Sequence, residues 1–310
     1  MQRYILVRLA QALVTLAVVS VIVFGVARMT GNPVDIYLPT DATPQQRADE
    51  VRRMGLDKPV YVQYGIFVRG LLQGDLGQSV KFRKPVSTLI AERLPNTAAL
   101  VLLAIVIALV IAFPLGIIAA LRQGGPWDVA ARVAALLGQS VPSFWGGIML
   151  MLVFAVQLGW LPVARKESLA SFVLPAVTIA LFGFMLAGVV RLLRTSLLEV
   201  LDSEFVKFAR IKGLPEYVVI LRHALRNALI PVVTFVGMYF GILLAGSVTV
   251  ETVFAWPGIG RLAYEAVRWR DYPVIQSVVL IAAAIIIVTN LVVDVLYGYL
   301  DPRIRYGRSG

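Results

Sequence analysis

Six long apolar stretches are the feature that most constrains how this chain can fold. A helix needs about 20 apolar residues to cross the hydrocarbon core of a bilayer, which is roughly 30 Å thick. The stretches at residues 9–27 and 97–121, for example, carry no charged side chain. Inside hydrocarbon every backbone N–H and C=O group must be paired within its own segment, so the stretches are predicted to be helices. The sequence therefore predicts an all-α integral membrane protein.

The six predicted transmembrane helices belong to a single domain of residues 1–310. They cover about residues 9–27, 97–121, 133–158, 168–190, 227–250 and 272–293. Pro142 lies inside the third helix between Gln139 and Gln157, which predicts a kink, followed by a short outer turn at residues 159–162. The first stretch exceeds the roughly 7–15 apolar residues of a signal-peptide core, so we expect an uncleaved anchor.

Composition agrees with a membrane location and excludes several chemistries. Apolar residues make up 59% of the chain and charged residues only 15%, and the mean hydropathy is +0.81. There is no cysteine and one histidine, His223, so the chain offers no disulfide, thiolate nucleophile or multi-histidine metal site. We expect no catalytic residue, no metal site and no bound cofactor. The net charge of +11 in so apolar a chain indicates membrane orientation, with lipid and not nucleic acid as its surroundings.

Lys and Arg residues in the short loops predict the orientation, because they gather on the cytoplasmic side. With both termini cytoplasmic, the inner loops hold Arg3, Arg8, Arg122, Arg191, Arg194, Lys207, Arg210, Lys212, Arg222, Arg226, Arg303, Arg305 and Arg308. The short outer loops hold only Arg165, Lys166, Arg261, Arg268 and Arg270. We therefore predict cytoplasmic termini and a long extracytoplasmic loop at residues 28–93.

This long loop is expected to contain two helices. Thr43, Pro44 and Gln46 form the pattern of an N-cap, a first-turn proline and a capping box, and Gly55 is predicted to end the helix. A second helix begins after Pro59 and ends at Gly74. Its stripe of aromatic and aliphatic residues either lies on the membrane interface or packs against outer helix ends; the stripe comprises Tyr61, Tyr64, Phe67, Val68, Leu71 and Leu72.

The cytoplasmic loop at residues 191–226 carries a short amphipathic helix. Asp202 or Ser203 is expected to cap it, and Gly213 to end it. One face is predicted to be apolar and to include Leu197, Leu201, Phe205, Phe208 and Ile211, while Lys207, Arg210 and Lys212 occupy the other. Such a helix suits the groove of a cytosolic partner, although a helix lying on anionic lipid has the same composition.

Motifs along nearly the whole chain resemble those of one family. They are GNPVD, LDKPVYVQYGIFVRGLLQGDLGQS, RLPNTAAL, SVPSFW, QLGWLPV, EFVKFARIKGLPEYVVILRHALRNALIPVV, VETVFAWPGIGRLAYEAVRWRDYPVIQ and VDVLYGYLDPRIRYG. Together they resemble permeases of binding-protein-dependent ABC importers, in the branch that imports dipeptides, oligopeptides, nickel and glutathione. The general Glu-Ala-Ala motif of these permeases is represented here only by Ala209, with Lys207 and Phe208 before it, as is typical of the peptide branch.

This resemblance implies a division of labour between subunits. The chain has no G-x-x-x-x-G-K-[ST] motif, so ATP and Mg would be bound by two partner ATPase subunits. A second homologous permease, as a heterodimer, and an extracytoplasmic substrate-binding protein are the other implied partners, in a bacterial inner membrane. The implied ATPase-coupling helix comprises Asp202, Ser203, Glu204, Phe205, Val206, Lys207, Phe208, Ala209, Arg210, Ile211, Lys212, Gly213 and Leu214.

Polar residues within the predicted spans are candidates for a hydrated pathway or for hydrogen bonds between helices. They are Gln139, Ser140, Ser143, Thr234, Ser247, Thr249 and Asn290. Asp294, the acidic residue at the cytoplasmic end of the sixth predicted span, is expected to pair with Arg191 or Arg194. At the outer side, Glu251 and Glu265 are candidate contacts for the binding protein, and Trp160, Trp256 and Trp269 for interface anchors.

Two other functional classes remain as alternatives. A proton-coupled secondary carrier would be expected to hold an ionisable residue near mid-membrane, and Asp294 lies near the cytoplasmic face. A membrane-embedded enzyme would need a Ser/His, Asp/Asp or metal-ligand constellation, which the predicted spans lack. A permease subunit driven by separate ATPases is the prediction that we carry forward.

Overall fold

The computed structural model describes residues 2–29, 34, 38, 42–53 and 55–300. Its elements are all helical over these ranges, where a single bridge joins Gln78 to Pro85, and the predicted all-α fold is confirmed. Four helices are long and apolar enough to cross a membrane, and two bent helix pairs bring the possible number of spans to six. Most of the GNPVD motif, and the basic residues Arg303, Arg305 and Arg308, lie outside the described residues.

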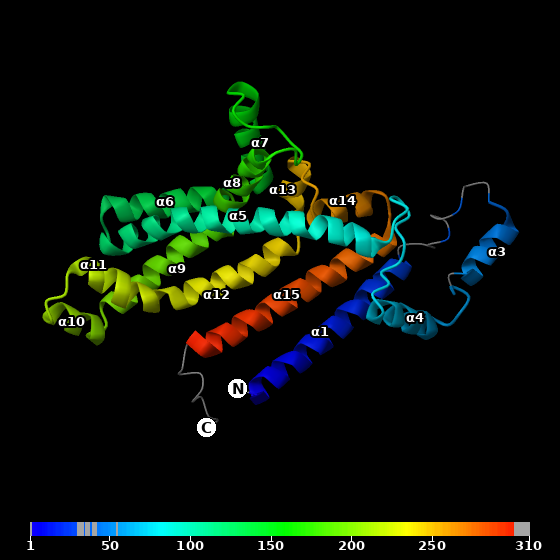
Figure 1. Cartoon of the computed structure of the whole chain (residues 1–310), viewed down its shortest axis with the longest axis horizontal. Helices are drawn as coiled ribbons and strands as arrows, with labels where there is room; N and C mark the ends of the chain where they lie inside the picture. The colour runs from blue at the N-terminus through cyan, green and yellow to red at the C-terminus, as the bar shows by residue number, and fades with distance from the viewer. Residues whose placement is uncertain (1, 30–33, 35–37, 39–41, 54, 301–310) are drawn as a thin grey trace.

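The long helices run along one another with their ends at two faces of the molecule (Figure 1). They are α1 (Gln2–Met29), α5 (Val86–Leu121), α12 (Leu225–Leu244) and α15 (Tyr272–Leu300). Helix α5 starts at Val86, well before the predicted residue 97. Its first turns include charged residues, so they lie outside the apolar stretch on which the prediction is based. Helix α12 ends at Leu244, earlier than the predicted residue 250, and residues 248–253 form the separate α13 (Val248–Val253).

The predicted third span is two helices and not one kinked helix. Helix α6 (Pro126–Ser140) meets α7 (Ser143–Leu150) and the π-helical η1 (Met151–Gln157) at an angle of 99°. At the break, Val141 and Pro142 have extended backbones with ψ of 123° and 132°. A residue before proline disfavours helical angles, and proline itself donates no hydrogen bond, so the helix stops here instead of bending.

The predicted fourth span at residues 168–190 is also broken. A 3₁₀ turn, η2 (Leu169–Phe172), leads into α8 (Val173–Leu181), and α9 (Phe184–Leu201) follows at 51°. Gly183 separates them with a φ of +135°, a conformation that residues with a side chain rarely adopt. Helix α9 then runs to Leu201, beyond the predicted end of the span at residue 190.

The helices pack through two kinds of contact. A core of buried aliphatic residues lies where α5, α9 and α12 meet and includes Val101, Val189, Leu193 and Val232. Helix α12 approaches α15 closely through Gly237 and Gly241, where an added Cβ would collide with Val293 and Thr289. Helix α1 lies outermost beside α15, with most of its surface unburied.

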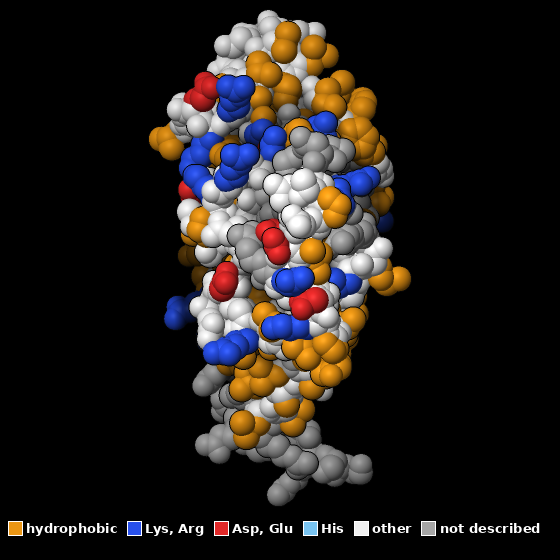
Figure 2. All heavy atoms as spheres, turned by 90° about the vertical axis from the view of Figure 1, so that its right-hand side faces the viewer, with side chains coloured by type: hydrophobic (Ala, Val, Ile, Leu, Met, Phe, Trp, Pro, Cys, Tyr) orange, Lys and Arg blue, Asp and Glu red, His pale blue; other side chains and the backbone are white. Residues whose placement is uncertain are grey.

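One end of the molecule is built from the loop helices. They are α3 (Pro44–Arg53), α4 (Val60–Leu72) and α14 (Ile259–Arg268). The capping box before α3 is confirmed, because Gln46 accepts from the Thr43 N–H at 2.9 Å while the Thr43 hydroxyl accepts from the Gln46 N–H at 3.3 Å. Basic and acidic side chains spread over this end, with apolar ones towards its edges (Figure 2), which suits a face in water.

Candidate functional site

A short helix stands at the opposite end of the molecule, on the left in Figure 1. It is α10 (Glu204–Ile211), close to the predicted bounds. Ser203 occupies the N-cap position, but its hydroxyl donates back to the Val200 carbonyl, so neither it nor Asp202 caps the helix with its side chain. Gly213 ends the turn at a φ of +76°. Pro215 then opens α11 (Glu216–Val218), which continues through the π-helical η3 (Val219–Ala224) into α12.

Helix α10 has two apolar sides where one was predicted. Val206 and Ala209 are buried and pack with Leu197 and Val219, which anchors the helix to the body. Phe205, Phe208 and Ile211 keep 46%, 62% and 79% of their surfaces exposed. The predicted face is therefore split, since Leu197 belongs to α9 and lies in the core.

The charges of α10 are largely paired within the loop itself. Lys207 lies 3.2 Å from the Glu204 carboxylate and 3.3 Å from that of Asp202. Arg210 donates to both oxygens of Glu216, at 2.7 and 3.2 Å, and this hydrogen bonding raises the pKa of Arg210. Because these cations already have partners, an exposed apolar side is the main feature that α10 offers to another surface.

The two broken helices meet at a small cavity of about 310 Å³. Gln139 and Ser143 line it from the α6–α7 break, Gly183 from the α8–α9 break, and Ser247 from beyond α12. Tyr239 of α12 contributes a further hydroxyl, which sequence reasoning missed because aromatic residues in spans are usually core. Neutral polar groups at interrupted helices are the type of lining that transporters place along a pathway.

Close backbone contact holds the two breaks together. The Gly183 N–H donates to the Gly138 carbonyl at 3.4 Å, and a Cβ added to Gly138 would lie only 2.6 Å from the Leu181 oxygen. The breaks of two helices far apart in sequence therefore form one unit.

The remaining predicted pathway residues lie elsewhere. Ser140 donates to the Leu136 carbonyl on the exposed side of α6, and Thr249 lies in α13. Thr234 and Asn290 line a separate cavity of about 360 Å³, together with Arg8 and Asp294. The predicted set is thus divided between two places, because spacing along a helix does not reveal which helices are neighbours.

The predicted partner of Asp294 is wrong. Its carboxylate lies 3.2 Å from Arg8 Nε of α1, which packs beside α15. Arg194 instead binds Asp128 at the start of α6, at 2.7 Å. The error arose because α1 and α15 are adjacent in space while being at opposite ends of the sequence.

Two residues predicted to face the outside are buried. Glu251 has no exposed surface and accepts hydrogen bonds from the Thr97 hydroxyl at 2.8 Å and the Arg261 N–H at 2.9 Å. Trp256 is also fully buried, and its indole donates to the Asn96 carbonyl at 3.1 Å. Both fasten the segment around residues 251–261 to α5. Trp160, Trp269 and, in part, Glu265 keep the exposure that was expected.

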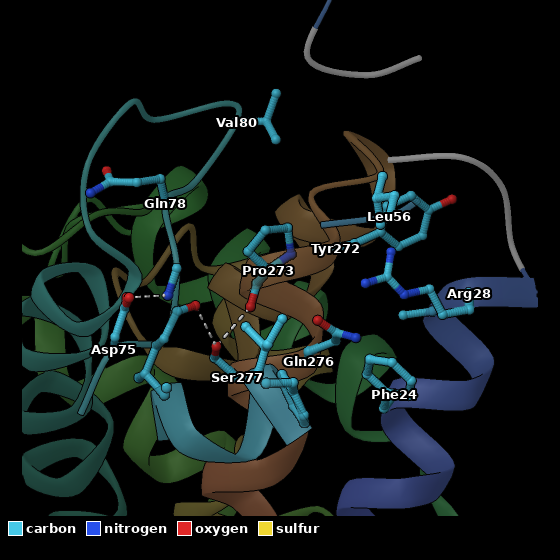
Figure 3. A pocket seen from close by; sticks show the side chains of 16 residues that line it. Phe24, Arg28, Leu56, Asp75, Gln78, Val80, Tyr272, Pro273, Gln276 and Ser277 are labelled. Carbon is cyan, nitrogen blue, oxygen red and sulfur yellow. Dashed lines mark hydrogen bonds between the residues drawn. The ribbon is translucent and has the colours of Figure 1, made fainter. Parts of the chain in front are cut away.

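A larger cavity of about 680 Å³ lies between α1, α4 and the start of α15 (Figure 3). Its floor is aromatic, with Phe24 and Phe67 in contact. On its far wall the Ser277 hydroxyl donates to the Pro273 carbonyl at 2.7 Å and approaches the Leu76 carbonyl at 3.3 Å. This cavity is a side pocket on the flank of α15, separate from the broken helices.

Family comparisons identify the architecture. Residues 112–306 match the family described as "Binding-protein-dependent transport system inner membrane component", and residues 1–101 match the N-terminal region of such membrane components. The chain belongs to this family. It is a permease subunit of a binding-protein-dependent ABC importer and an inner-membrane protein, as its motifs indicated.

Relatives resemble this permease over nearly its whole length. It is 38% identical over 335 residues to the dipeptide transport system permease protein DppB of Alkalihalophilus pseudofirmus, covering 99% of this chain and 100% of the relative. It is 42% identical over 308 residues to the glutathione transport system permease protein GsiC of Salmonella choleraesuis, with the same coverage. The Escherichia coli GsiC is 41% identical over 308 residues, again covering 99% and 100%.

Solved structures support the fold of the permease. A chain of the MetNI methionine ABC transporter in an inward-facing conformation aligns with a TM-score of 0.57 and 17% identity, covering 69% of this chain and 96% of that one. An amino acid ABC transporter crystallised with histidines aligns with a TM-score of 0.51 and 19% identity, covering 70% and 94%. At these identities the likeness concerns the fold alone.

Proposed function

We propose that this permease imports small peptides, such as dipeptides or glutathione, as one half of a pathway shared with a second, homologous permease chain. Two ATPase subunits bind ATP and Mg and drive it, and an extracytoplasmic binding protein delivers the cargo. The support for a peptide cargo comes from its relatives, which are permeases of dipeptide and glutathione transport systems.

Helix α10 is the proposed contact with the ATPases, and its exposed apolar side is the observation that carries this role. Phe205, Phe208 and Ile211 would insert into a groove of the ATPase, while Val206 and Ala209 keep α10 attached to α9. An apolar face that a protein keeps exposed at a polar surface marks a site of interaction. Closure of the ATPases on ATP would then displace α10 together with α9.

The arm formed by α7 and η1 is the proposed contact with the second permease. It projects from the bundle (Figure 1), and Phe144, Trp145 and Val156 on it are exposed. Large aromatic and aliphatic side chains of this kind are typical of subunit interfaces. A heterodimer would place two such arms around a shared pathway.

The cavity at the two helix breaks suits a cargo that varies. Gln139, Ser143, Ser247 and Tyr239 are neutral, so they hydrate a peptide without selecting a charge. The alternative of a proton-coupled carrier is weaker, because Asp294 is paired with Arg8 and Asp128 with Arg194. Neither acid is placed as a free proton site.

Replacing both Phe205 and Phe208 by Asp tests the coupling role. The tagged permease, expressed with its operon neighbours, should still reach the membrane but retain less than a tenth of the wild-type amount of ATPase subunits on purification. The physical reason is that two charges cannot be desolvated in an apolar groove. ATP-driven uptake into reconstituted vesicles should be lost in parallel.

The matched control is Leu72→Asp, which places the same charge on an exposed apolar residue of α4 at the other end of the molecule. It should retain the ATPases at the wild-type level. Full retention by the Phe205→Asp, Phe208→Asp variant would remove α10 from the ATPase contact, and a wild-type chain that never retains an ATPase would refute the proposed function as a whole.

A further inference from the structure

A partly buried ion pair joins the start of α6 to α9, and the Arg194 side chain in it keeps 19% of its surface exposed. Arg194 Nε donates to Oδ1 of Asp128 at 2.7 Å, and Arg194 Nη2 donates to Oδ2 at 2.8 Å. The Gly124 N–H donates to Oδ2 at 3.0 Å, and Arg132 Nε lies 3.1 Å from Oδ1. Asp128 has no exposed surface. Each carboxylate oxygen thus has two cationic or N–H partners, and Arg194 of the other helix supplies one of the two on each oxygen.

Stability alone is a poor explanation for such a pair. Desolvating two charges opposes most of the attraction between them, and well-packed apolar residues often do as well. A bidentate Arg–carboxylate pair does provide something that apolar contact lacks, since two parallel hydrogen bonds define both the distance and the angle between the two groups. The pair therefore sets the position of α6 relative to α9.

On the α6 side, the rest of the contact between α6 and α9 consists of small residues. Ala131 and Ala135 follow Asp128 along the same side of α6 and are buried, and Gly138, next along this side, approaches the Leu181 carbonyl at the end of α8, just before α9 begins. Small side chains allow the helices to come close, but they form no directional bond that would define their relative position. Along α6, the directional bonds are those of Asp128 at one end and of the Gly138 carbonyl at the other.

Helices α6 and α9 connect the proposed ATPase contact at α10 to the cavity at the two helix breaks. Helix α9 continues after two residues into α10, and α6 ends at the break whose Gln139 and Ser143 line the cavity. We propose that Asp128 and Arg194 are positioning residues that make α6 move with α9 and α10 as one lever. A displacement of α10 then reaches both broken helices at the cavity. The inference rests on the proposed function, because it assumes that the ATPases move α10.

Distance measurement on the assembled transporter tests the lever. The chain has no cysteine, so spin labels can be placed at Leu137→Cys on α6 and Glu199→Cys on α9, both exposed, with partner subunits free of reactive cysteine. In otherwise wild-type permease, the distance between the labels should be the same without nucleotide and with ATP trapped by vanadate. In the Asp128→Asn, Arg194→Met variant it should shift or broaden on trapping, since the Asn keeps the Gly124 bond but no ionic fork remains.

A functional readout accompanies the distances. With dialanine as the probe peptide, the ratio of ATP hydrolysis with the binding protein to that without it should fall at least threefold in the double variant. Arg194→Lys should cause a smaller fall, because an ammonium cannot form two parallel bonds to the carboxylate. The control variant Lys84→Met, Glu92→Asn removes an exposed ion pair of 3.2 Å on α5 and the loop before it, and should behave as wild type.

Two outcomes would overturn the proposal. One is a distance that changes on trapping in wild-type permease, which would mean that α6 and α9 move separately. The other is wild-type distances and a wild-type ratio in both the double variant and Arg194→Lys, which would reduce the pair to a structural role. Retention of ATPases by the wild-type chain tests the proposed function separately, so the two failures are distinguishable.

Discussion

At the scale of single residues, buried carboxylates join segments of the chain through hydrogen bonds. Asp128 joins α6 to α9, Glu251 joins the segment before α14 to α5, and Asp271 accepts from the Ser79 hydroxyl and from the Lys81 N–H at 3.1 Å. Each connects parts that are distant in sequence. In the sequence, Glu251 and Glu265 look alike, because only the fold shows which of them lies under Thr97.

The burial of Glu251 predicts a pH dependence of stability. Burial raises the pKa of its carboxyl, while the bonds from Arg261 and Thr97 oppose that rise. An acid with a raised pKa in the folded state stabilises the fold fully below its unfolded pKa of about 4.3. That contribution is lost as the pH rises through the folded pKa. Melting temperatures in detergent, taken from pH 4 to 8, should therefore fall more steeply in wild type than in Glu251→Gln.

Glu265→Gln is the control for this measurement, since Glu265 is part-exposed and paired with Arg261 at 2.8 Å. It should follow the wild-type slope. Identical slopes in wild type and Glu251→Gln would show that the hydrogen bonds from Thr97 and Arg261 offset the effect of burial on the pKa of Glu251.

Helix ends decide the geometry at the scale of elements. Pro142 and Gly183 each interrupt an apolar stretch, and the interruptions meet at the cavity. Gly213 ends α10 in a left-handed conformation, and a Cβ there would meet no atom within 4 Å. A substitution at Gly213 therefore acts through the backbone, not through a clash.

Gly213→Val is predicted to disturb the angle of α10 without preventing membrane insertion. A β-branched residue at positive φ costs about 1–2 kcal/mol, which the turn can relieve by shifting. ATP-driven uptake in reconstituted vesicles should fall several-fold, with normal amounts of permease in the membrane. Gly213→Asn is the matched control, because Asn tolerates this conformation, and it should transport at close to the wild-type rate. Equal transport by both variants would contradict the role of the turn.

At the scale of the whole molecule, close helix packing determines how α12, α15 and α1 are held together. Gly237 and Gly241 lie one turn apart on α12 and let α15 approach, while α15 in turn carries α1 through Asp294 and Arg8. Because α1 is itself little buried, its place depends on α15. The contact between α12 and α15 thus joins the N-terminal helix to the bundle.

Gly241→Val is predicted to separate α15 from α12. An added Cβ would lie 2.9 Å from Cβ of Thr289, and such overpacking typically costs about 1–3 kcal/mol. The melting temperature in detergent should fall, and proteolysis in the long loop after α1 should accelerate. Gly25→Val on α1, where no atom lies within 4 Å of an added Cβ, is the control and should leave both unchanged. A stable Gly241→Val variant would mean that α15 is held mainly by other contacts.

Much of this permease follows from local sequence. The apolar stretches, the capping box at Thr43 and Gln46, and the bounds of α10 depend on residues close together in the chain, so they could be predicted. The family followed from motifs spread over the whole sequence. The helix breaks follow from the sequence only in part, since Pro142 predicts a kink where the structure has two separate helices.

Contacts between distant segments came from the fold. The pairing of Asp294 with Arg8, the burial of Glu251 and the meeting of the two breaks at Gly138 and Gly183 each join segments without a local pattern. Apolar periodicity indicates which face of a helix is buried in a protein surrounded by water. In a transmembrane helix nearly every face is apolar, so periodicity does not indicate which face packs against a neighbour. The choice of neighbours is made by small residues and single ion pairs, whose partners only the packed structure reveals.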